Sequence, residues 1–359
     1  MRLEEIYPKR SPDAEKQHKD SMREQSTDFS EAWKHPEKIT TPAGEEVDLY
    51  DMRPREQKTS VPVMMVGGFD YNVESWKKNM REFVSRGRRA IMVDAVHGVR
   101  RDPEVKKSIN AATDKATNVE YRKITALMAG IDAAGVEKID AVAHSEGCID
   151  LLIAAVSYPE RFRNIILVEP AGMIGKDSLL GLAGRNNKGE VPAMNEAHDA
   201  QKRGDPRFRF EMHSDDQMFP EAKRTLIDRL RSVPELFSIA GIQVADLLRK
   251  VKEKGIGIII VSSPEDKMFP IERMIGTVKR DEKGDIVFDE NRKPVMEKKG
   301  TIGNERMADE ENFSKVIDGF YSVAGIHERL FNQPVEFTQL FEGAFTALEA
   351  KQSKEAASV

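Results

Sequence analysis

Apolar residues in this chain gather into short runs rich in valine and isoleucine, and polar or glycine-containing turns separate these runs. In five of them consecutive positions are apolar, so both faces of an extended strand would be buried. Strands that are covered on both faces are typical of parallel sheets, because the connecting helices lie above and below the sheet. The five predicted strands are residues 61–66, 90–93, 138–143, 164–168 and 256–261.

Helical periodicity fills most of the gaps between these strands. Apolar residues recur at helical spacing in 73–86, 119–134 and 147–158. Alternating strands and helices predict an α/β chain with a mostly parallel central sheet, helices on both faces and right-handed connections. Ligands on such sheets bind beyond the carboxyl ends of the strands, so we expect a site there.

A long insertion, residues 172–254, separates two of the predicted strands by far more chain than one connecting helix needs. Amphipathic patterns at 221–233 and 242–252 predict that it is a mainly helical lid. Its phenylalanine and methionine side chains either line an apolar acyl pocket or pack within the lid itself. They are Phe208, Phe210, Met212, Met218 and Phe219.

Two further segments depart from the strand–helix pattern. The first thirty-five residues are polar with almost no apolar periodicity, which predicts a flexible or loosely docked arm. Residues 278–312 are highly charged and contain a hairpin-like pattern, which predicts a surface feature. A first hairpin is expected at 38–52. The expected domains are the arm at 1–35, a discontinuous core at 36–171 and 255–350, the lid at 172–254 and a tail at 351–359.

The composition of the chain excludes several classes of protein. A chain of 359 residues can bury a sizeable core, and its net charge of −5 comes with no basic stripe, so no nucleic-acid partner is expected. The single cysteine, Cys148, excludes an intramolecular disulfide. No signal peptide or membrane span is recognised, so a cytoplasmic protein is expected. Neither a metal cluster nor a nucleotide-binding motif is present, and no cofactor is expected.

The strongest candidate for a catalytic residue is Ser145. The strand predicted at 138–143 leads into Ala143-His144-Ser145-Glu146-Gly147, and a helix follows at once. Strand, abrupt turn and helix form the context of the nucleophile elbow, where small residues flank a serine whose hydroxyl is exposed above the sheet. The pentapeptide alone is equally compatible with a serine that only caps a core helix. The choice between a nucleophile and a helix cap therefore depends on the other motifs of the chain.

The chain resembles the α/β-hydrolase family over roughly Lys38 to Leu348, less the two insertions. Four landmarks carry the resemblance: Val66-Gly67-Gly68-Phe69, the elbow at Ala143–Gly147, Glu265-Asp266 after a late strand, and Gly325-Ile326-His327. The elbow begins with alanine rather than the commoner glycine. Gly67-Gly68 replaces the usual His-Gly, which changes how the oxyanion loop is held.

The resemblance implies a Ser-His-Asp catalytic triad. Ser145 is the expected nucleophile, and His327 is the expected base because it alone of seven histidines follows the late strand. Asp266 is the expected acid, with Glu265 as the competitor. The chain order Ser, Asp, His is the order of this fold.

The same resemblance places the oxyanion hole at two backbone N–H groups. One belongs to Glu146 and the other to Phe69, with Gly67 and Gly68 as the supporting loop. The Glu146 side chain either faces the site or pairs with a basic residue. His144 is interpreted as structural.

We therefore expect a serine hydrolase that acts through an acyl-enzyme on a small-molecule substrate, most simply a carboxylic ester. An amidase or aminopeptidase, a thioesterase, an acyltransferase and a C–C hydrolase share the same triad, and a non-catalytic receptor would share the fold. Activity should fall below about pH 6–7 as histidine protonates.

The sequence does not determine the oligomeric state. An aminopeptidase would need an anionic subsite, for which Glu190, Glu196, Asp215 and Asp216 are available.

Overall fold

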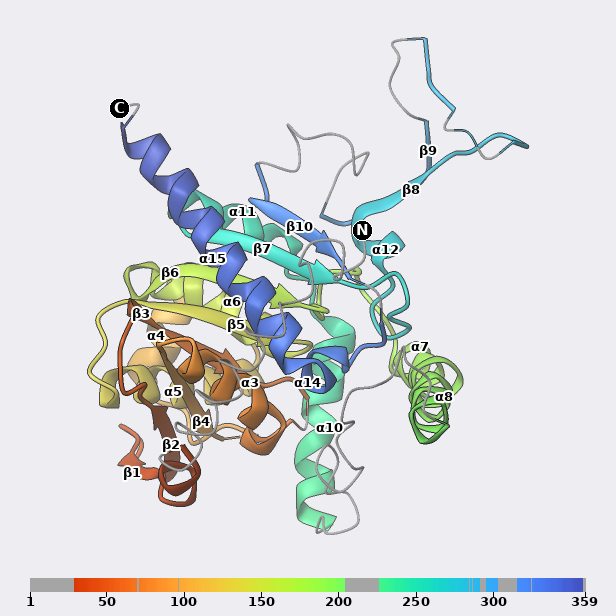
Figure 1. Ribbon diagram of the computed structural model, residues 1–359. Coiled ribbons are helices and arrows are strands. Elements are labelled where there is room, and N and C mark those ends of the chain that lie inside the picture. The colour runs from red at the N-terminus through yellow and green to blue at the C-terminus, as the bar shows by residue number, and fades with distance from the viewer. Residues whose placement is uncertain are drawn as a thin grey trace.

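The computed structural model describes residues 29–69, 71–95, 97–203, 226–283, 285, 287–290, 295–302, 315–323 and 325–357. At its centre lies an eight-stranded sheet with the order β1-β2-β4-β3-β5-β6-β7-β10 (Figure 1). The strands are β1 (Glu37–Thr40), β2 (Glu46–Met52), β3 (Thr59–Val66), β4 (Arg88–Asp94), β5 (Ile139–His144), β6 (Phe162–Val168), β7 (Gly257–Ser262) and β10 (Gly319–Ser322).

Most of the sheet is parallel. From β4 to β10 every neighbouring pair of strands is parallel, whereas β1 and β2 form an antiparallel hairpin at one edge and β2 also runs antiparallel to β4. The five predicted strands are the central strands β3 to β7, and their side chains are buried on both faces. The predicted fold class is therefore confirmed.

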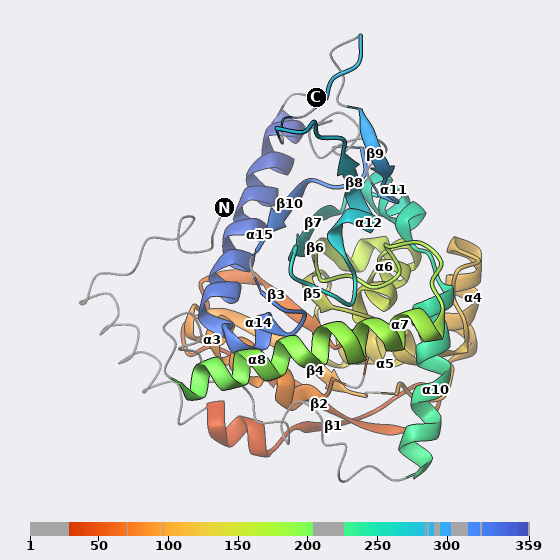
Figure 2. The same ribbon diagram turned by 90° about the vertical axis from the view of Figure 1, so that its right-hand side faces the viewer.

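Helices cover both faces of the sheet (Figures 1 and 2). On one face, α3 (Val73–Ser85) packs against α15 (Pro334–Ala357), with Trp76 and Phe83 buried together with Phe341. The other face carries four helices whose apolar side chains form the larger core cluster. They are α4 (Pro103–Ala112), α5 (Asn118–Ala133), α6 (Gly147–Ser157) and α11 (Ala245–Glu253).

The described part of the 172–254 insertion is helical. It contains α7 (Leu179–Arg185), the π-helix η2 (Asn186–Glu190), α8 (Val191–Lys202), α10 (Leu226–Gly241) and α11. Figure 2 shows α7 and α8 crossing the side of the molecule at which the strands end. In contrast, α11 buries Leu247, Leu248 and Val251 in the core beside α6. The predicted pocket residues Phe208, Phe210, Met212, Met218 and Phe219 lie outside the described residues.

The charged insertion projects from the body of the protein as a hairpin (Figure 1). Strand β8 (Gly276–Val278) pairs with β9 (Met296–Lys299) in antiparallel fashion. Beyond them the Val287 N–H donates to the Lys279 carbonyl at 3.0 Å, and the Val295 N–H donates to Val287 at 2.8 Å. Short elements at the strand ends complete the core: η1 (Pro159–Arg161), α12 (Ile271–Ile275) and α14 (Arg329–Asn332).

Helices extend into both expected terminal segments. Residues 29–34 form a helix that buries Phe29 and Trp33, and the Trp33 indole donates to Glu74 at 2.7 Å. The two aromatic rings are four residues apart and so share one helix face, a signal too short to register as periodicity. Residues 1–28 lie outside the described part.

At the other end, α15 continues to Ala357, so the expected tail is helical over 351–357. Two side chains in this last stretch hold it to the core. Lys351 donates to Asp318 at 2.6 Å, and Gln352 donates to Asn164 at 3.1 Å. No helix in the described ranges has both the length and the apolar composition needed to cross a membrane.

Candidate active site

The candidate residues meet at the carboxyl ends of neighbouring strands. Ser145 directly follows β5 and Glu169 directly follows β6, while Asp266 and His327 lie on the loops after β7 and β10. These four strands are adjacent in the sheet. Parallel strands bring segments that are distant in sequence to one edge of the sheet, which is why the site could be placed there from the strand pattern.

Ser145 occupies a sharp turn. Its φ of +55° lies in the left-handed region, where a residue with a side chain costs about 1–2 kcal/mol. Three backbone hydrogen bonds hold this conformation. The Ser145 N–H donates to Val168 at 3.0 Å, and its carbonyl accepts from Ala171 at 3.1 Å and from Cys148 at 3.2 Å. The strand–turn–helix geometry predicted at 143–147 is present.

Gly147 is required by the strand beside the elbow. A Cβ atom at this position would lie 2.4 Å from the Gly67 carbonyl oxygen and 2.8 Å from that of Val66. Both atoms belong to backbone at the end of β3 and cannot rotate away. The small residue is therefore needed because α6 begins against the end of β3.

We expect the substitution Gly147→Ala to disable the site and to lower the melting temperature, since the new methyl group would push α6 and the Gly67 backbone apart. A loss of about 100-fold in turnover is expected from a displacement of about 1 Å. Turnover and thermal unfolding would be measured side by side. Gly184→Ala is the matched control, because a Cβ atom there meets nothing within 4 Å. Equal behaviour of the two variants would contradict this account of the elbow.

The loop after β3 lies directly against Ser145. A Cβ atom on Gly68 would be 2.8 Å from the Cβ of Ser145 and 2.9 Å from the His144 carbonyl oxygen. Glycine thus allows this loop to approach the serine, as the sequence predicted. Phe69 comes next on the loop and packs partly buried against the core. Glu146, on the other side of Ser145, is the N-cap of α6.

His327 and Asp266 form a buried pair. The Nδ1 atom of His327 lies 3.0 Å from Oδ2 of Asp266, and both residues are at most 4% exposed. The other carboxylate oxygen of Asp266 accepts the backbone N–H groups of Met268 at 2.7 Å and Phe269 at 3.1 Å. Glu265, the alternative acid, is exposed. The structure therefore brings Asp266, and not Glu265, to the histidine.

His144 supports the histidine loop and does not itself titrate near neutral pH. Its Nε2–H donates to the His327 carbonyl at 2.9 Å, and the two rings lie 4.6 Å apart. Burial lowers the pKa of His144 well below its usual value, and the neighbouring His327 lowers it further. The ring is thus neutral, in agreement with the structural role expected from the sequence.

The charge of His327 is set by the acids around it. Burial alone would lower its pKa, but the Asp266 carboxylate, with smaller contributions from Glu328 and Glu190, outweighs burial and raises the pKa to about 9. Burial would raise the pKa of Asp266, yet His327 and the hydrogen bonds that Asp266 accepts lower it overall. The imidazolium–carboxylate form of the pair is therefore favoured around neutral pH.

Glu169 is a member of the site that the sequence did not reveal. It lies 3% exposed with a φ of +46°, and its carboxyl group is hydrogen-bonded to Asp266, to the Ser262 hydroxyl at 2.9 Å and to the Ser263 N–H at 3.2 Å. Burial and the charge of Asp266 raise its pKa well above the usual range. A protonated Glu169 donates to Asp266. The only available signal was a carboxylic acid that directly follows a buried strand.

One group of three residues in the described ranges has ligand atoms close enough to hold a metal ion, all within 4.8 Å of one another. It consists of Glu169, Asp266 and His327. The same atoms are already joined by the hydrogen bonds from His327 and Glu169 to Asp266. We interpret the group as this hydrogen-bonded chain.

The Glu146 side chain pairs with a buried lysine. Lys123 of α5 donates to Glu146 at 2.8 Å and to Glu235 of α10 at 3.2 Å, and Glu235 lies 2.8 Å from His97. Burial raises the pKa of Glu146 to about 7, although Lys123 opposes this shift. Of the two orientations expected for the Glu146 side chain, the structure shows the pairing with a basic residue. Through Lys123, Glu146 is linked to Glu235 on α10 of the insertion.

The acids considered for an anionic subsite differ in their surroundings. Glu190 is completely buried and Glu196 is exposed, whereas Asp215 and Asp216 lie outside the described residues. Glu190 accepts backbone hydrogen bonds from the loops that carry Asp266 and His327. Its carboxylate is therefore occupied by the protein itself.

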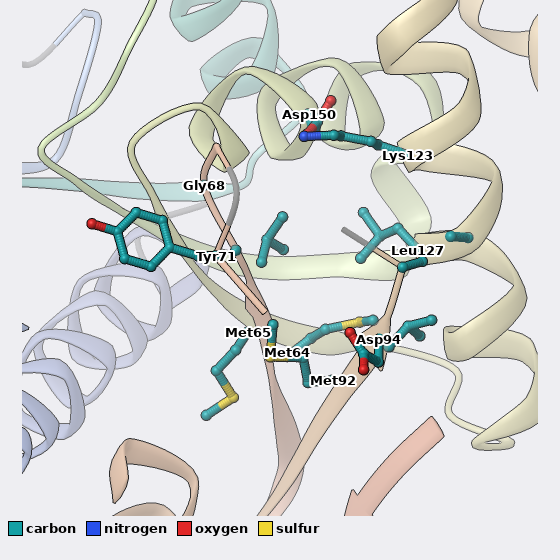
Figure 3. Close-up of a pocket in the computed structure, with 14 residues that line it drawn as sticks. Met64, Met65, Gly68, Tyr71, Met92, Asp94, Lys123, Leu127 and Asp150 are labelled. Carbon is teal, nitrogen blue, oxygen red and sulfur yellow. The ribbon is translucent and has the colours of Figure 1, made fainter. Parts of the chain in front are cut away.

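A small cavity of about 50 Å³ lies behind the loop that follows β3 (Figure 3). The methionines Met64, Met65 and Met92 form one end, and Lys123 and Asp150 point toward each other at the other end. Substrate pockets usually measure about 300–1,000 Å³, so this space suits one or two water molecules. Neither Ser145 nor His327 lines it. This cavity is therefore separate from the candidate site.

Comparisons with known proteins reveal similarity of structure only. No protein-family model matches the sequence, and no curated protein matches it. Among solved structures, an esterase from Exiguobacterium antarcticum is 12% identical, with 88% of this chain and 99% of that chain covered and a TM-score of 0.52. A bromoperoxidase from Bacillus anthracis is 11% identical over 86% and 100% of the two chains, again with a TM-score of 0.52. A serine hydrolase involved in carbazole degradation is 14% identical over 87% and 98%, with a TM-score of 0.51. The fold is therefore shared along nearly the full length of these proteins.

Proposed function

We propose that this chain, which has the α/β-hydrolase fold, is a serine hydrolase that cleaves carboxylic esters through an acyl-enzyme. One observation carries the proposal: Ser145 is held in a strained turn at the centre of the sheet, and the buried pair of His327 and Asp266 follows strands on one side of it. Strain of this kind persists only where the surrounding structure imposes it, and it clusters at functional sites.

In the proposed mechanism the Ser145 hydroxyl attacks the ester carbonyl carbon while His327 takes its proton. Since Nδ1 of His327 faces Asp266, Nε2 is the nitrogen that receives it. The N–H groups of Glu146 and Phe69 stabilise the oxyanion. His327 then gives the proton to the departing alcohol. Water, deprotonated by His327, attacks the acyl-enzyme and releases the carboxylic acid and free Ser145.

Two considerations favour an ester among the substrates that suit this mechanism. An esterase is among the proteins with similar structures, although a shared fold does not determine the substrate. An aminopeptidase would need a free carboxylate to bind the substrate amine; Glu190, the buried acid next to His327 among the four considered, already accepts two backbone N–H groups. A non-catalytic receptor would not require the buried pair of His327 and Asp266.

Labelling with a fluorophosphonate tests the proposal, because this probe reacts only with an activated serine. We expect one adduct on Ser145, located by peptide mapping, and none in a His327→Ala variant. The rate of labelling should rise with pH up to about 9, since only neutral His327 accepts the proton and its pKa is raised from 6.5 to about 9. The expected fall in activity thus begins at higher pH than the ordinary histidine value implies.

An adduct on another residue, or equal labelling of the His327→Ala variant, would refute the assignment of Ser145 and His327. A labelling rate that is independent of pH between 6 and 9 would contradict His327 as the base. The matched control is Ser353→Ala, which removes an exposed hydroxyl near the end of α15 and should label as the wild type does.

A further inference from the structure

The inserted helices contact the two catalytic loops through one carboxylate. Glu190 is the last residue of η2 and is completely buried. Its Oε1 accepts the backbone N–H of His327 at 2.8 Å, and its Oε2 accepts the backbone N–H of Lys267 at 3.3 Å. Lys267 directly follows Asp266. A single side chain therefore joins the loop of the proposed base to the loop of the proposed acid.

We propose that Glu190 is a positioning residue, which sets the spacing between His327 and Asp266 and makes the reactivity of Ser145 depend on the docking of the inserted helices. This inference rests on the proposed function. A carboxylate suits the task because it has two acceptor oxygens and no donor, so it can accept an N–H group from each of two loops. A glutamine side chain has only one acceptor atom.

The insertion is shaped to deliver Glu190 to this position. A Cβ atom on Gly189 would lie 2.7 Å from the Cβ of Lys267, so glycine allows η2 to sit directly on the acid loop. One turn earlier, the Arg185 guanidinium donates to the Met268 carbonyl at 2.8 Å. A π-helix is rare and frequently occurs at functional sites. Arg185, Gly189 and Glu190 thus all lie against residues 267–268.

A second carboxylic acid extends the network to the oxyanion loop. Glu328 follows His327, is 4% exposed, and accepts the Tyr71 hydroxyl at 3.2 Å. Burial and the neighbouring Glu190 raise the pKa of Glu328 to about 8, although His327 opposes the shift. The Glu328 carboxyl group is hydrogen-bonded to Glu190, and a protonated Glu328 donates this bond.

The substitution Glu190→Gln tests the proposal, with Glu196→Gln on exposed α8 as the matched control. We expect kcat for a short soluble ester to fall about 10- to 100-fold while KM changes less than about twofold, because a small misplacement of catalytic groups acts on the chemical step. The His327 pKa, followed by NMR of ¹⁵N-labelled histidine, should also fall, since the Glu190 charge helps to raise it. A purely structural residue would change the melting temperature without moving this pKa.

A second variant separates the effect of the position of the Glu190 carboxylate from the effect of its charge. It also replaces the glutamine variant if that variant does not fold. Glu190→Asp keeps the charge but shortens the side chain by one methylene group, so kcat should fall while the His327 pKa stays high. Wild-type kcat in both variants, or a His327 pKa unchanged by Glu190→Gln, would overturn the proposal. If the wild-type protein reacts with neither ester nor phosphonate, the proposed function fails, and the NMR titration still decides whether Glu190 acts on His327.

Discussion

Replacing Ser145 with alanine is expected to lower kcat for ester hydrolysis by about 10⁶-fold, the loss known for removal of the nucleophile from a serine hydrolase. No other group can form the acyl-enzyme in its place, and only binding and the oxyanion donors would still assist the attack of water. The residual rate would be measured with excess enzyme on a chromogenic ester, after purification free of host esterases.

The alanine variant should fold as the wild type does. Alanine also has to adopt the φ of +55° that Ser145 adopts, so the backbone strain is retained and the change in melting temperature should be small. Substrate should still bind. Retention of more than about one part in a thousand of the wild-type kcat in a folded variant would place the nucleophile elsewhere.

Replacing Asp266 with asparagine is expected to lower kcat by about 10⁴-fold, since an asparagine in this position favours the wrong tautomer of the histidine. In the wild type His327 Nδ1–H donates to the carboxylate at 3.0 Å. An amide can turn its NH₂ group toward the same nitrogen and thereby place the proton on Nε2, the atom that must accept from Ser145. The pKa of His327 should fall as well, because Asp266 is the main charge that raises it.

The matched control for this prediction is Glu265→Gln, which removes the neighbouring, exposed acid. It should leave kcat within about twofold of the wild type, in keeping with the small effects of surface substitutions. A large loss with Glu265→Gln and a small loss with Asp266→Asn would make Glu265 the acid. A large loss in both would require each acid to act on the site, which the geometry around His327 does not support.

The sheet could be predicted from the sequence because its strands carry their own signal. The segments that form β3 to β7 are runs of consecutive apolar residues, as expected for strands that are buried on both faces. An amphipathic helix instead has apolar residues spaced three or four positions apart. The parallel arrangement then placed Ser145, Asp266 and His327 at one edge. Gly147 was identified because the elbow needs small residues, although the backbone that it lies against follows from the neighbouring strand β3. Gly68 was identified from the resemblance, as part of the loop that approaches the serine.

The supporting residues could not be predicted in the same way. Glu169, Glu190 and Lys123 are charged residues in segments without an unusual pattern, and a charge run is normally a solvated surface. Their burial results from contacts between elements far apart in the chain. Glu190, for example, meets loops that follow it by 77 and 137 positions. Such contacts depend on how the insertion docks, which local periodicity does not encode.

The place of β10 in the sheet determines the order in which activity is acquired and lost. This strand lies at the edge, pairs only with β7, and comes late in the chain, whereas β5 with Ser145 lies in the middle. During synthesis Ser145 therefore emerges well before the proposed base His327, and the proposed site cannot be complete until β10 has joined the sheet. Because β10 is short and has a strand on one side only, we expect this edge to open at lower free energy than the central strands. We therefore expect that, on heating or addition of denaturant, the proposed esterase activity is lost while the central strands remain paired.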